Sequence, residues 1–489
     1  MDERQPLLGP IDAPQQSIAD QPLVDFDKNG DPENPLDWPK SYKRGVVLLL
    51  ALMSFTVTFT CIGIVPVADQ IVLDLEGRES KSASILLVTV WELGEAAGPL
   101  IVAPLSEIYG RYPVLNVANT IFIFGVILSA LSETSGLFIF ARFLTGFATA
   151  SNVLNPAIIG DMFAPEARGA GMSLIMLSPL LGGAIGPAIS GTIAETLGWR
   201  MILWISAGLA IICEVAFFML LRETYKVPIL QRRAARLRKE TKDESLKCAW
   251  ETETTGKAAG SSALKAAIKR PLLVMWDSSV LQILSFYGGL VFTVYYVMAT
   301  TLPTILREVY GFSSAWIGYS FLAFSIGATG GIVVSNVFLD SLYVKLSKSN
   351  GGVGIPEHRI PFMLVGALIL PSVVALYGWV PYAHWPVSLL LIAVALIGFF
   401  IILTWIPLAS YVVDAFGIYS ASGMTIVLIA RCLGGTLLPL AIPPLTDAFG
   451  LGYGFLVLAA IFLALVPLPA AVMRYGQHWR QKSKYTRNE

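Results

Sequence analysis

Residues 84–106, SILLVTVWELGEAAGPLIVAPLS, form an apolar run long enough to cross a lipid bilayer as a helix. A helix rises about 1.5 Å per residue, so a run of this length spans a hydrocarbon core of about 30 Å. Two glutamates, Glu92 and Glu95, interrupt the run near its middle. Because an ionised carboxylate is costly inside a membrane, we expect both to face a bundle interior or a wet cavity.

The whole chain has the composition of a membrane protein. Of its 489 residues, 55% are hydrophobic and 14% are charged, and its mean hydropathy is +0.67. Soluble domains carry about 25% charged residues. The sequence therefore predicts an all-α membrane protein with twelve transmembrane helices, at residues 45–67, 84–106, 113–132, 136–157, 170–193, 201–221, 277–302, 315–339, 360–380, 385–408, 420–444 and 450–473.

Basic residues are distributed unevenly between the two sides of these spans. With a cytoplasmic N-terminus, 28 of the 34 Lys and Arg residues fall in inner tails and loops, and four fall in outer loops. The remaining two, Arg142 and Arg431, lie within spans. The positive-inside rule then predicts that both termini are cytoplasmic.

A charged linker separates the spans into two sets of six, which suggests a duplicated architecture. Transporters of this kind bind their substrate between the halves, near the bilayer midplane. The predicted units are a cytoplasmic polar N-tail, an N-terminal six-helix bundle, a cytoplasmic linker, a C-terminal six-helix bundle and a cytoplasmic C-tail, at residues 1–44, 45–222, 223–275, 276–473 and 474–489.

Glu92 and Glu95 are the strongest candidates for a functional role. Spaced i and i+3, they share one helix face near the midplane. Burial and mutual repulsion oppose ionisation of both, so one can load and release a proton or attract a cationic substrate. The alternative is a fixed strut, bonded to a neighbouring helix or paired with Arg142. For Glu214, the sequence supports a structural role and a role in transport equally.

Small and aromatic residues mark two further spans. Residues 182–191, GGAIGPAISG, place small residues along one face, where two helices can pack closely, slide or seal. Residues 285–297, SFYGGLVFTVYYV, offer aromatic side chains for a cavity that holds a bulky amphipathic or cationic ligand. The candidates are Phe286, Tyr287, Phe292 and Tyr295. Tyr295 and Tyr296 point to different faces, so at most one should line the cavity; core packing is the alternative reading.

Several classes of function are disfavoured by the sequence. No phosphate-binding loop or HExxH motif occurs, and the three histidines lie outside the predicted spans. We therefore expect no enzyme activity, catalytic residue, metal or cofactor. The energy for transport is expected to come from an ion gradient or from the gradient of the substrate itself. Zero net charge gives no reason to expect nucleic acid. The four cysteines are expected to be buried small hydrophobic residues.

Several motifs resemble those of the major facilitator superfamily. APLSEIYGRYPVL (103–115) resembles its loop signature, ARFLTGFATA (141–150) its fourth-helix arginine motif, and GGAIGPAISG its fifth-helix antiporter motif. ENPLDWPKSYK (33–43), ETYKVPILQRRAARLRKET (223–241) and PEHRIP (356–361) resemble the fungal branch of twelve-span drug:proton antiporters. The resemblance covers residues from about 25 to 475 and implies the major facilitator fold.

The resemblance also implies roles for individual residues. Glu107, Gly110 and Arg111 take the places of a conformational latch between helix ends. Arg142 joins Glu92 and Glu95 in proton or substrate coupling. The antiporter motif falls on Gly182, Gly186, Pro187 and Gly191.

The leading hypothesis is a secondary active transporter that exports a drug, toxin or secondary metabolite by proton antiport through alternating access. Export of a polyamine or other cation, an uptake facilitator, and a non-transporting membrane sensor are the alternatives. The expected partners are a small-molecule substrate, protons and the lipid bilayer, and the protein is expected to be a monomer. We expect the cell membrane as its location. An acidic-dileucine spacing at Glu3, Leu7 and Leu8 makes the vacuolar membrane the alternative.

Overall fold

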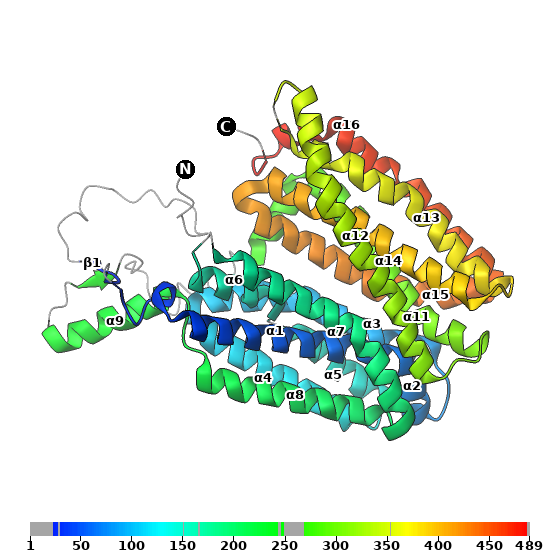
Figure 1. Cartoon of the computed structure of the whole chain (residues 1–489), viewed down its shortest axis with the longest axis horizontal. Helices are drawn as coiled ribbons and strands as arrows, with labels where there is room; N and C mark the ends of the chain where they lie inside the picture. The colour runs from blue at the N-terminus through cyan, green and yellow to red at the C-terminus, as the bar shows by residue number, and fades with distance from the viewer. Residues whose placement is uncertain are drawn as a thin grey trace.

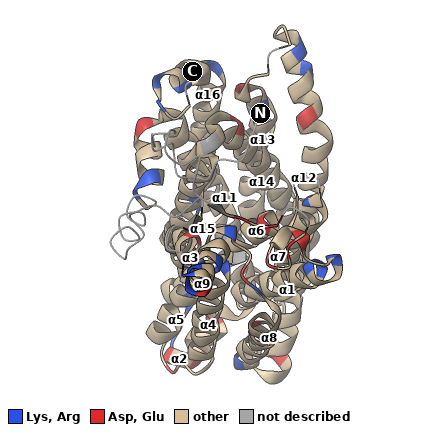
Figure 2. Cartoon of the chain, turned by 90° about the vertical axis from the view of Figure 1, so that its left-hand side faces the viewer, with Lys and Arg blue, Asp and Glu red and all other residues tan. Residues whose placement is uncertain are grey.

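Long helices make up nearly all of the regular structure. The computed structural model describes residues 23–27, 30–149, 151–164, 167–242, 246–248, 268–352 and 354–486. The helices lie side by side in two bundles (Figure 1), and Figure 2 shows them from the left-hand side of that view. The predicted all-α membrane fold is confirmed.

The first bundle, here called the N-half, comprises residues 40–220. Its helices are α1 (Lys40–Gly63), α2 (Ala68–Glu76), α3 (Lys81–Tyr109), α4 (Arg111–Ala130), α5 (Ser135–Phe147), α6 (Ser151–Met162), α7 (Gly169–Leu197) and α8 (Trp199–Leu220), with the 3₁₀ helix η2 (Val65–Val67) after α1. Within it, α1 packs against α7, α3 against α5 and α4 against α8. The Ser80 hydroxyl accepts a hydrogen bond from the Ala83 N–H, a cap that fixes where α3 begins.

The second bundle, the C-half, comprises residues 279–482. Its helices are α11 (Ser279–Glu308), α12 (Ser314–Ser349), α13 (Ile360–Tyr382), α14 (Val387–Phe416), α15 (Ser420–Leu465) and α16 (Pro467–Lys482), with the 3₁₀ helices η4 (Pro356–Arg359) and η5 (Gly417–Tyr419). α11 packs against α15, and α12 against α14. The two halves meet along two helix pairs, α7 with α12 and α3 with α15.

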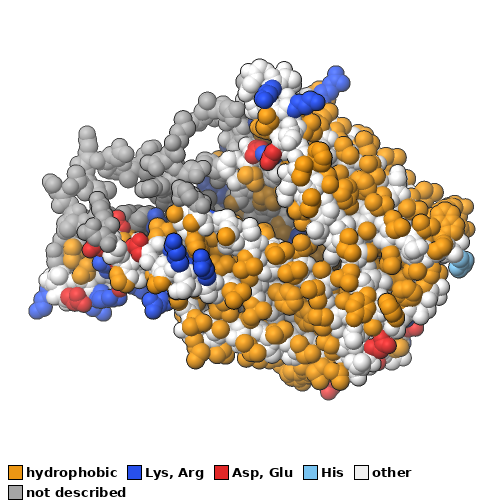
Figure 3. Space-filling model, in the orientation of Figure 1, with side chains coloured by type: hydrophobic (Ala, Val, Ile, Leu, Met, Phe, Trp, Pro, Cys, Tyr) orange, Lys and Arg blue, Asp and Glu red, His pale blue; other side chains and the backbone are white. Residues whose placement is uncertain are grey.

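Ten helical segments in the described part of the chain are long and apolar enough to cross a membrane. The difference from twelve lies at two places. The predicted fourth span is divided, because α5 ends at Phe147 and α6 begins at Ser151. The predicted eleventh and twelfth spans share α15, which changes direction at Gly450, where φ is 77° and ψ is 166°. Hydrophobic side chains cover most of the face shown in Figure 3, as expected for contact with lipid tails.

A small polar assembly lies outside the spans. Strand β1 (Leu23–Val24) pairs in parallel with strand β2 (Lys247–Cys248), and helix α9 (Lys226–Thr241) packs against both. Leu230 and Ala234 of α9 form a small core with Val24 and Cys248. We call this side of the molecule the α9 end and the opposite side the α2 end (Figure 1). The unit boundaries drawn from the sequence stay predictions.

Candidate functional site

Glu92 and Glu95 of α3 lie at the contact between the halves and face α11 and α15. They are 1% and 5% exposed. The Tyr296 hydroxyl on α11 donates a hydrogen bond to Glu92 Oε1. Arg431 Nη2 on α15 lies 3.1 Å from Glu95 Oε2 and 3.8 Å from Glu92 Oε2. Both glutamates therefore interact with side chains of the opposite half.

Glycines set the position of these two carboxylates. A Cβ at Gly94 would lie 2.3 Å from the Phe143 carbonyl oxygen, and one at Gly146 would lie 2.0 Å from the Trp91 carbonyl oxygen. Real side chains do not pack at such distances, so α3 and α5 touch backbone to backbone at these two positions. Gly94 lies against α5, and its neighbours Glu92 and Glu95 project toward the other half.

Arg431 is placed by a similar close approach within the C-half. A Cβ at Gly289 of α11 would lie 3.1 Å from the Arg431 backbone nitrogen. The Phe292 ring, nearly one turn further along α11, lies 4.7 Å from the Arg431 guanidinium. A cation over an aromatic face is stabilised by the ring quadrupole. α11 thus supplies an aromatic surface on which Arg431 rests beside the two glutamates.

Five aromatic rings form a cluster beside this arginine, and one of them, Phe292, is the ring that its guanidinium contacts. Phe292 contacts Trp405 of α14 at 5.2 Å between centroids, and Tyr295 contacts Tyr296 at 4.9 Å and Phe324 of α12 at 4.8 Å. Tyr295 and Tyr296 are both buried and share the cluster, although the sequence suggested that only one would. Trp405 and Phe324 were missed because an isolated aromatic residue in an apolar span carries no distinguishing signal.

Two of the predicted cavity residues lie elsewhere. Phe286 is 54% exposed, and Tyr287 is fully buried. Among the described residues, neither makes a ring contact with the cluster around Arg431. Phe292 and Tyr295 therefore remain as the predicted aromatic residues near the glutamates.

The charges of this central site do not balance. Two carboxylates face one guanidinium, and Glu92 Oε2 makes no hydrogen bond to a described residue. Burying an uncompensated charge in a membrane is costly, so the site favours one further positive charge. A proton on either carboxyl or a bound cation supplies it.

Arg142 does not pair with the glutamates, which corrects the alternative of a glutamate–Arg142 strut. Its guanidinium is 1% exposed and donates to three backbone carbonyl oxygens, those of Leu87 at 3.3 Å, Thr60 at 3.2 Å and Cys61 at 2.8 Å. These contacts tie α5 to α1 and α3. The partner of the glutamates is Arg431, from the other half. A role for Arg142 in coupling stays a prediction.

The glycine motif of α7 lies against both α1 and the other half. Gly182 faces α1, where a Cβ would lie 2.8 Å from the Phe55 carbonyl oxygen. A Cβ at Gly191 would lie 2.3 Å from the Ser314 carbonyl oxygen of α12. On the α12 side of the same contact, a Cβ at Gly318 would lie 2.1 Å from the carbonyl oxygen of Pro187. A Cβ at Gly186 would make only ordinary van der Waals contacts, since the nearest atom, in Phe59, would be 3.5 Å away.

Arg111 belongs to a polar network at the α9 end. Its side chain lies 3.3 Å from Asp161 Oδ2 and 2.5 Å from Ser106 Oγ, and its backbone N–H donates to Glu223 Oε1 at 2.8 Å. Gly110 has a φ of 101°, and a Cβ there would lie 2.1 Å from Glu223 Oε2. Asp161 and Glu223 were missed because they lie far from Arg111 in the sequence.

Glu107 is the member of the predicted latch that makes no hydrogen bond or ion pair to a described residue. Its side chain is exposed, yet it lies close enough to Arg111 for the two opposite charges to attract each other. The structure thus joins Gly110 and Arg111 in one hydrogen-bonded network and places Glu107 beside it.

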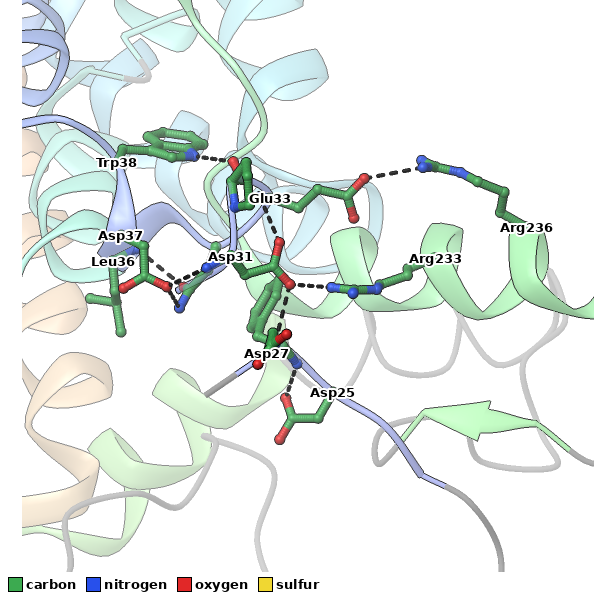
Figure 4. Close-up of polar contacts among 12 residues, drawn as sticks. Asp25, Asp27, Asp31, Glu33, Leu36, Asp37, Trp38, Arg233 and Arg236 are labelled. Atoms are coloured by element: carbon green, nitrogen blue, oxygen red, sulfur yellow. Dashed lines mark hydrogen bonds and ion pairs between the residues drawn. The ribbon is translucent and has the colours of Figure 1, made fainter. Parts of the chain in front are cut away.

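A second polar cluster joins α9 to the N-tail (Figure 4). Arg233 of α9 forms an ion pair with Asp31, and Arg236 lies 3.1 Å from Glu33. Asp31 also accepts from the Glu33 N–H at 2.9 Å. Burial opposes ionisation of Asp31, but the hydrogen bonds from Arg233 and the backbone outweigh it and hold the pKa of Asp31 below its ordinary value.

Polar contacts join the halves at the α2 end. Each crosses from the N-half to the C-half: Gln70 Nε2 to Ser314 Oγ at 3.1 Å, Lys81 Nζ to Asp447 Oδ1 at 2.8 Å, Asp69 Oδ2 to Thr304 Oγ1 at 3.2 Å, the Pro66 carbonyl oxygen to Arg307 Nη2 at 3.2 Å, and Glu195 Oε2 to the Ala315 N–H at 3.1 Å. At this end, the halves are closed on each other.

Two helical bundles that cross a membrane, with ionisable side chains buried where they meet, define a membrane transport protein. The family can be named from the sequence. A model described as Major Facilitator Superfamily matches residues 46–439, and the chain belongs to that superfamily. It is a multi-pass membrane transporter and not a member of an enzyme family.

Fungal proteins match it over nearly their whole length. The chain is 32% identical to "Efflux pump radE" of Floropilus chiversii, with 96% of this chain and 87% of that protein covered. It is also 32% identical to "MFS-type transporter penM" of Penicillium rubens, with 98% and 94% covered. These matches confirm a resemblance to fungal transporters of the superfamily.

Solved structures share the fold at low identity. The human organic anion transporter MFSD10 (TETRAN) has a TM-score of 0.59 at 18% identity, with 88% of this chain and 100% of that chain covered. A D-xylose-proton symporter has a TM-score of 0.64 at 15% identity, with 88% and 99% covered.

Proposed function

We propose that this protein is a secondary active transporter that exports a hydrophobic or amphipathic small molecule in exchange for protons. The observation that carries the proposal is the central site, where Glu92 and Glu95 of one half face Arg431 of the other. With two carboxylates and one guanidinium, this site can take up a proton or a cationic group. Export is supported by the name of the relative "Efflux pump radE".

The same contacts couple charge to conformation. In alternating access, the halves rock about the central site and expose it to one side at a time. A proton on Glu95 removes its charge attraction to Arg431, and so weakens a contact between the halves. A substrate that displaces the proton restores the charge. The two ligands therefore favour different arrangements of the halves, as exchange requires.

The excess negative charge also favours the second candidate, export of a polyamine or another organic cation. The aromatic cluster around Arg431 suits either an amphipathic molecule or a cation.

In both cases we place the α9 end in the cytoplasm, because basic residues gather on that side, and we propose the cell membrane as the location. The vacuolar alternative depends on Glu3, Leu7 and Leu8, which lie outside the described residues.

The test begins with metabolite profiles of cells with and without the protein. A compound that accumulates in the cells when the protein is absent is then loaded into proteoliposomes, and its flux is measured with and without an opposing proton gradient. We expect the gradient to accelerate flux, and the variant Glu92→Gln with Glu95→Gln to lose this acceleration. Glu79→Gln, an exposed position in the loop before α3, is the control. Equal acceleration in the double variant would rule out the coupling role.

A further inference from the structure

A cavity opens between the halves at the α2 end, separate from the central glutamate site. Its volume is about 200 Å³. The N-half contributes residues of η2, α2 and α3, and the C-half contributes residues of α11 and α15. Val88 lines it and lies one helical turn before Glu92, while Glu92, Glu95 and Arg431 do not line it. The cavity therefore does not include the three charged residues of the central site.

The wall of this cavity carries more negative than positive charge. Asp69, Glu308 and Asp447 line it, with Lys81 as the cation among the lining residues. Lys81 is paired with Asp447, and Asp69 is 3.6 Å from Arg307 just outside the wall. Glu308 has no ion pair to a described residue. A positively charged ligand is therefore favoured over a neutral or negative one.

The wall of the cavity also contains a buried hydroxyl group that can bond to a ligand. Ser84 lines the cavity and is 7% exposed, and its hydroxyl makes no hydrogen bond to a described residue. Most of the wall is apolar, with Ala68, Ile85 and Val88 on one side and Ile442 on the other, and threonines of α11 and α15 complete it. An apolar cavity of about 150 Å³ is known to hold benzene. A substituted benzene with a cationic head therefore fits this space.

We propose that this cavity is a binding site for a small aromatic or aliphatic organic cation that enters from the α2 end. Its apolar part packs between Ala68 and Ile442, and its charge lies toward Glu308. Because both halves form the wall, an occupant holds them closed at the α2 end and slows the change to the opposite arrangement. The site goes beyond the proposed function, since its ligand need not be the transported molecule.

The test uses the purified full-length protein and benzyltrimethylammonium, a permanently charged cation. Its neutral isostere neopentylbenzene, with carbon in place of nitrogen, is the matched ligand. We expect the cation to raise the thermal unfolding temperature with concentration, because it binds the folded state, and the neutral compound to do so much less. Equal effects of the two ligands, or no binding of the cation at millimolar concentration, would overturn the proposal.

Two variants locate the site. Glu308→Gln should weaken cation binding by about five-fold, the effect of one partly solvated charge. Ala68→Leu should fill the cavity and abolish binding. Glu79→Gln removes a nearby exposed charge outside the wall and should leave binding unchanged. Unchanged affinity in Glu308→Gln would place the ligand elsewhere, even if Ala68→Leu failed to fold.

A flux measurement separates an external ligand from an exported one. Benzyltrimethylammonium added only on the α2 side of oriented vesicles should slow transport of an exported compound, and the same concentration on the α9 side should not. Transport of the cation itself, or inhibition only from the α9 side, would contradict an external site. Because the binding experiment measures neither flux nor pH, its failure leaves the proton-exchange proposal standing.

Discussion

Arg431 Nη2 lies 3.1 Å from Glu95 Oε2, although the two residues are 336 positions apart and belong to different halves of the chain. Arg431 is also the cation nearest to Glu92 in the described contacts, at 3.8 Å. One guanidinium therefore serves two buried carboxylates. This arrangement makes the contact between the halves sensitive to any change of charge at these three residues.

Replacing Arg431 with Gln should destabilise the protein strongly. The change removes the cation that Glu92 and Glu95 share, and removing one partner of a buried ion pair costs about 3–5 kcal/mol. The double variant Glu95→Gln with Arg431→Gln should recover part of this loss. Thermal unfolding of the two single variants and the double variant forms a double-mutant cycle that measures the coupling. Arg78→Gln, at an exposed position, is the control, and additive effects would refute the coupling.

Tyr296→Phe should destabilise the protein through the loss of its hydrogen bond to Glu92. A hydrogen bond to a charged group contributes about 1.5–3 kcal/mol. Tyr295→Phe is a matched control, because the Tyr295 ring lies in the same cluster and its hydroxyl makes no hydrogen bond to a described residue. In a Glu92→Gln background the effect of Tyr296→Phe should shrink. Equal losses from both tyrosine variants would show that the hydrogen bond to Glu92 contributes nothing beyond the general cost of removing a buried hydroxyl.

Gly318→Ala should disturb the contact between α12 and α7. The added Cβ would lie 2.1 Å from the Pro187 carbonyl oxygen, so the two helices must separate. Overpacking of this kind costs about 1–3 kcal/mol. We expect a lower unfolding temperature and reduced transport. Gly208→Ala on α8, where nothing lies within 4 Å of the added atom, is the control. Full transport in Gly318→Ala would mean that this close approach is not required.

The spans were predictable from the sequence because hydropathy is a local property. The break in the fourth span was not, since it depends on the backbone geometry of residues 148–149, just after α5 ends. The Thr149 hydroxyl donates to the Thr145 carbonyl oxygen there, a local bond that competes with regular helix contacts. The non-helical backbone of Gly450 separates the two parts of α15, which correspond to the predicted spans 420–444 and 450–473.

The glutamates could be predicted, but their partners could not. Glu92 and Glu95 stand out because carboxylates are rare within spans. Arg431 was visible as a second intramembrane arginine, yet only the rotation of α15 and its packing against α11 bring it to α3. Arg142 seemed the nearer partner in the sequence, but its side chain points to carbonyls of α1 and α3. Helix rotations are set by packing between elements, which one sequence does not specify.

Gly110→Ala should lower the unfolding temperature more than Gly198→Ala. Both glycines join two consecutive helices with similar backbone angles, φ 101° and ψ 163° at Gly110 and φ 86° and ψ 158° at Gly198, so both substitutions strain the backbone to a similar degree. At Gly110 the added Cβ would also lie 2.1 Å from Glu223 Oε2, whereas nothing lies within 4 Å of it at Gly198. The difference between the two variants measures the clash with the Arg111 network. Equal losses would indicate that the Glu223 side chain moves aside without cost.

Asp31 should make attachment of the N-tail to α9 dependent on pH. Its pKa in the folded protein is below its ordinary value, which is about 3.9 in an unfolded chain. The stabilisation is therefore fully present above about pH 4 and is lost as the pH falls through the lowered folded value. Spin labels at Leu36→Cys and Lys239→Cys report the distance between the N-tail and α9, and the four native cysteines are buried.

We expect a narrow distance distribution at neutral pH that broadens only in strong acid. In Asp31→Asn the ion pair with Arg233 is absent at every pH, so the distribution should already be broad at pH 7 and should change little on acidification. Asp25→Asn is the control, because Asp25 is exposed and accepts a hydrogen bond only from the adjacent Phe26 N–H. A narrow distribution in Asp31→Asn would mean that β1 and the small core around Leu230 hold the N-tail without the ion pair.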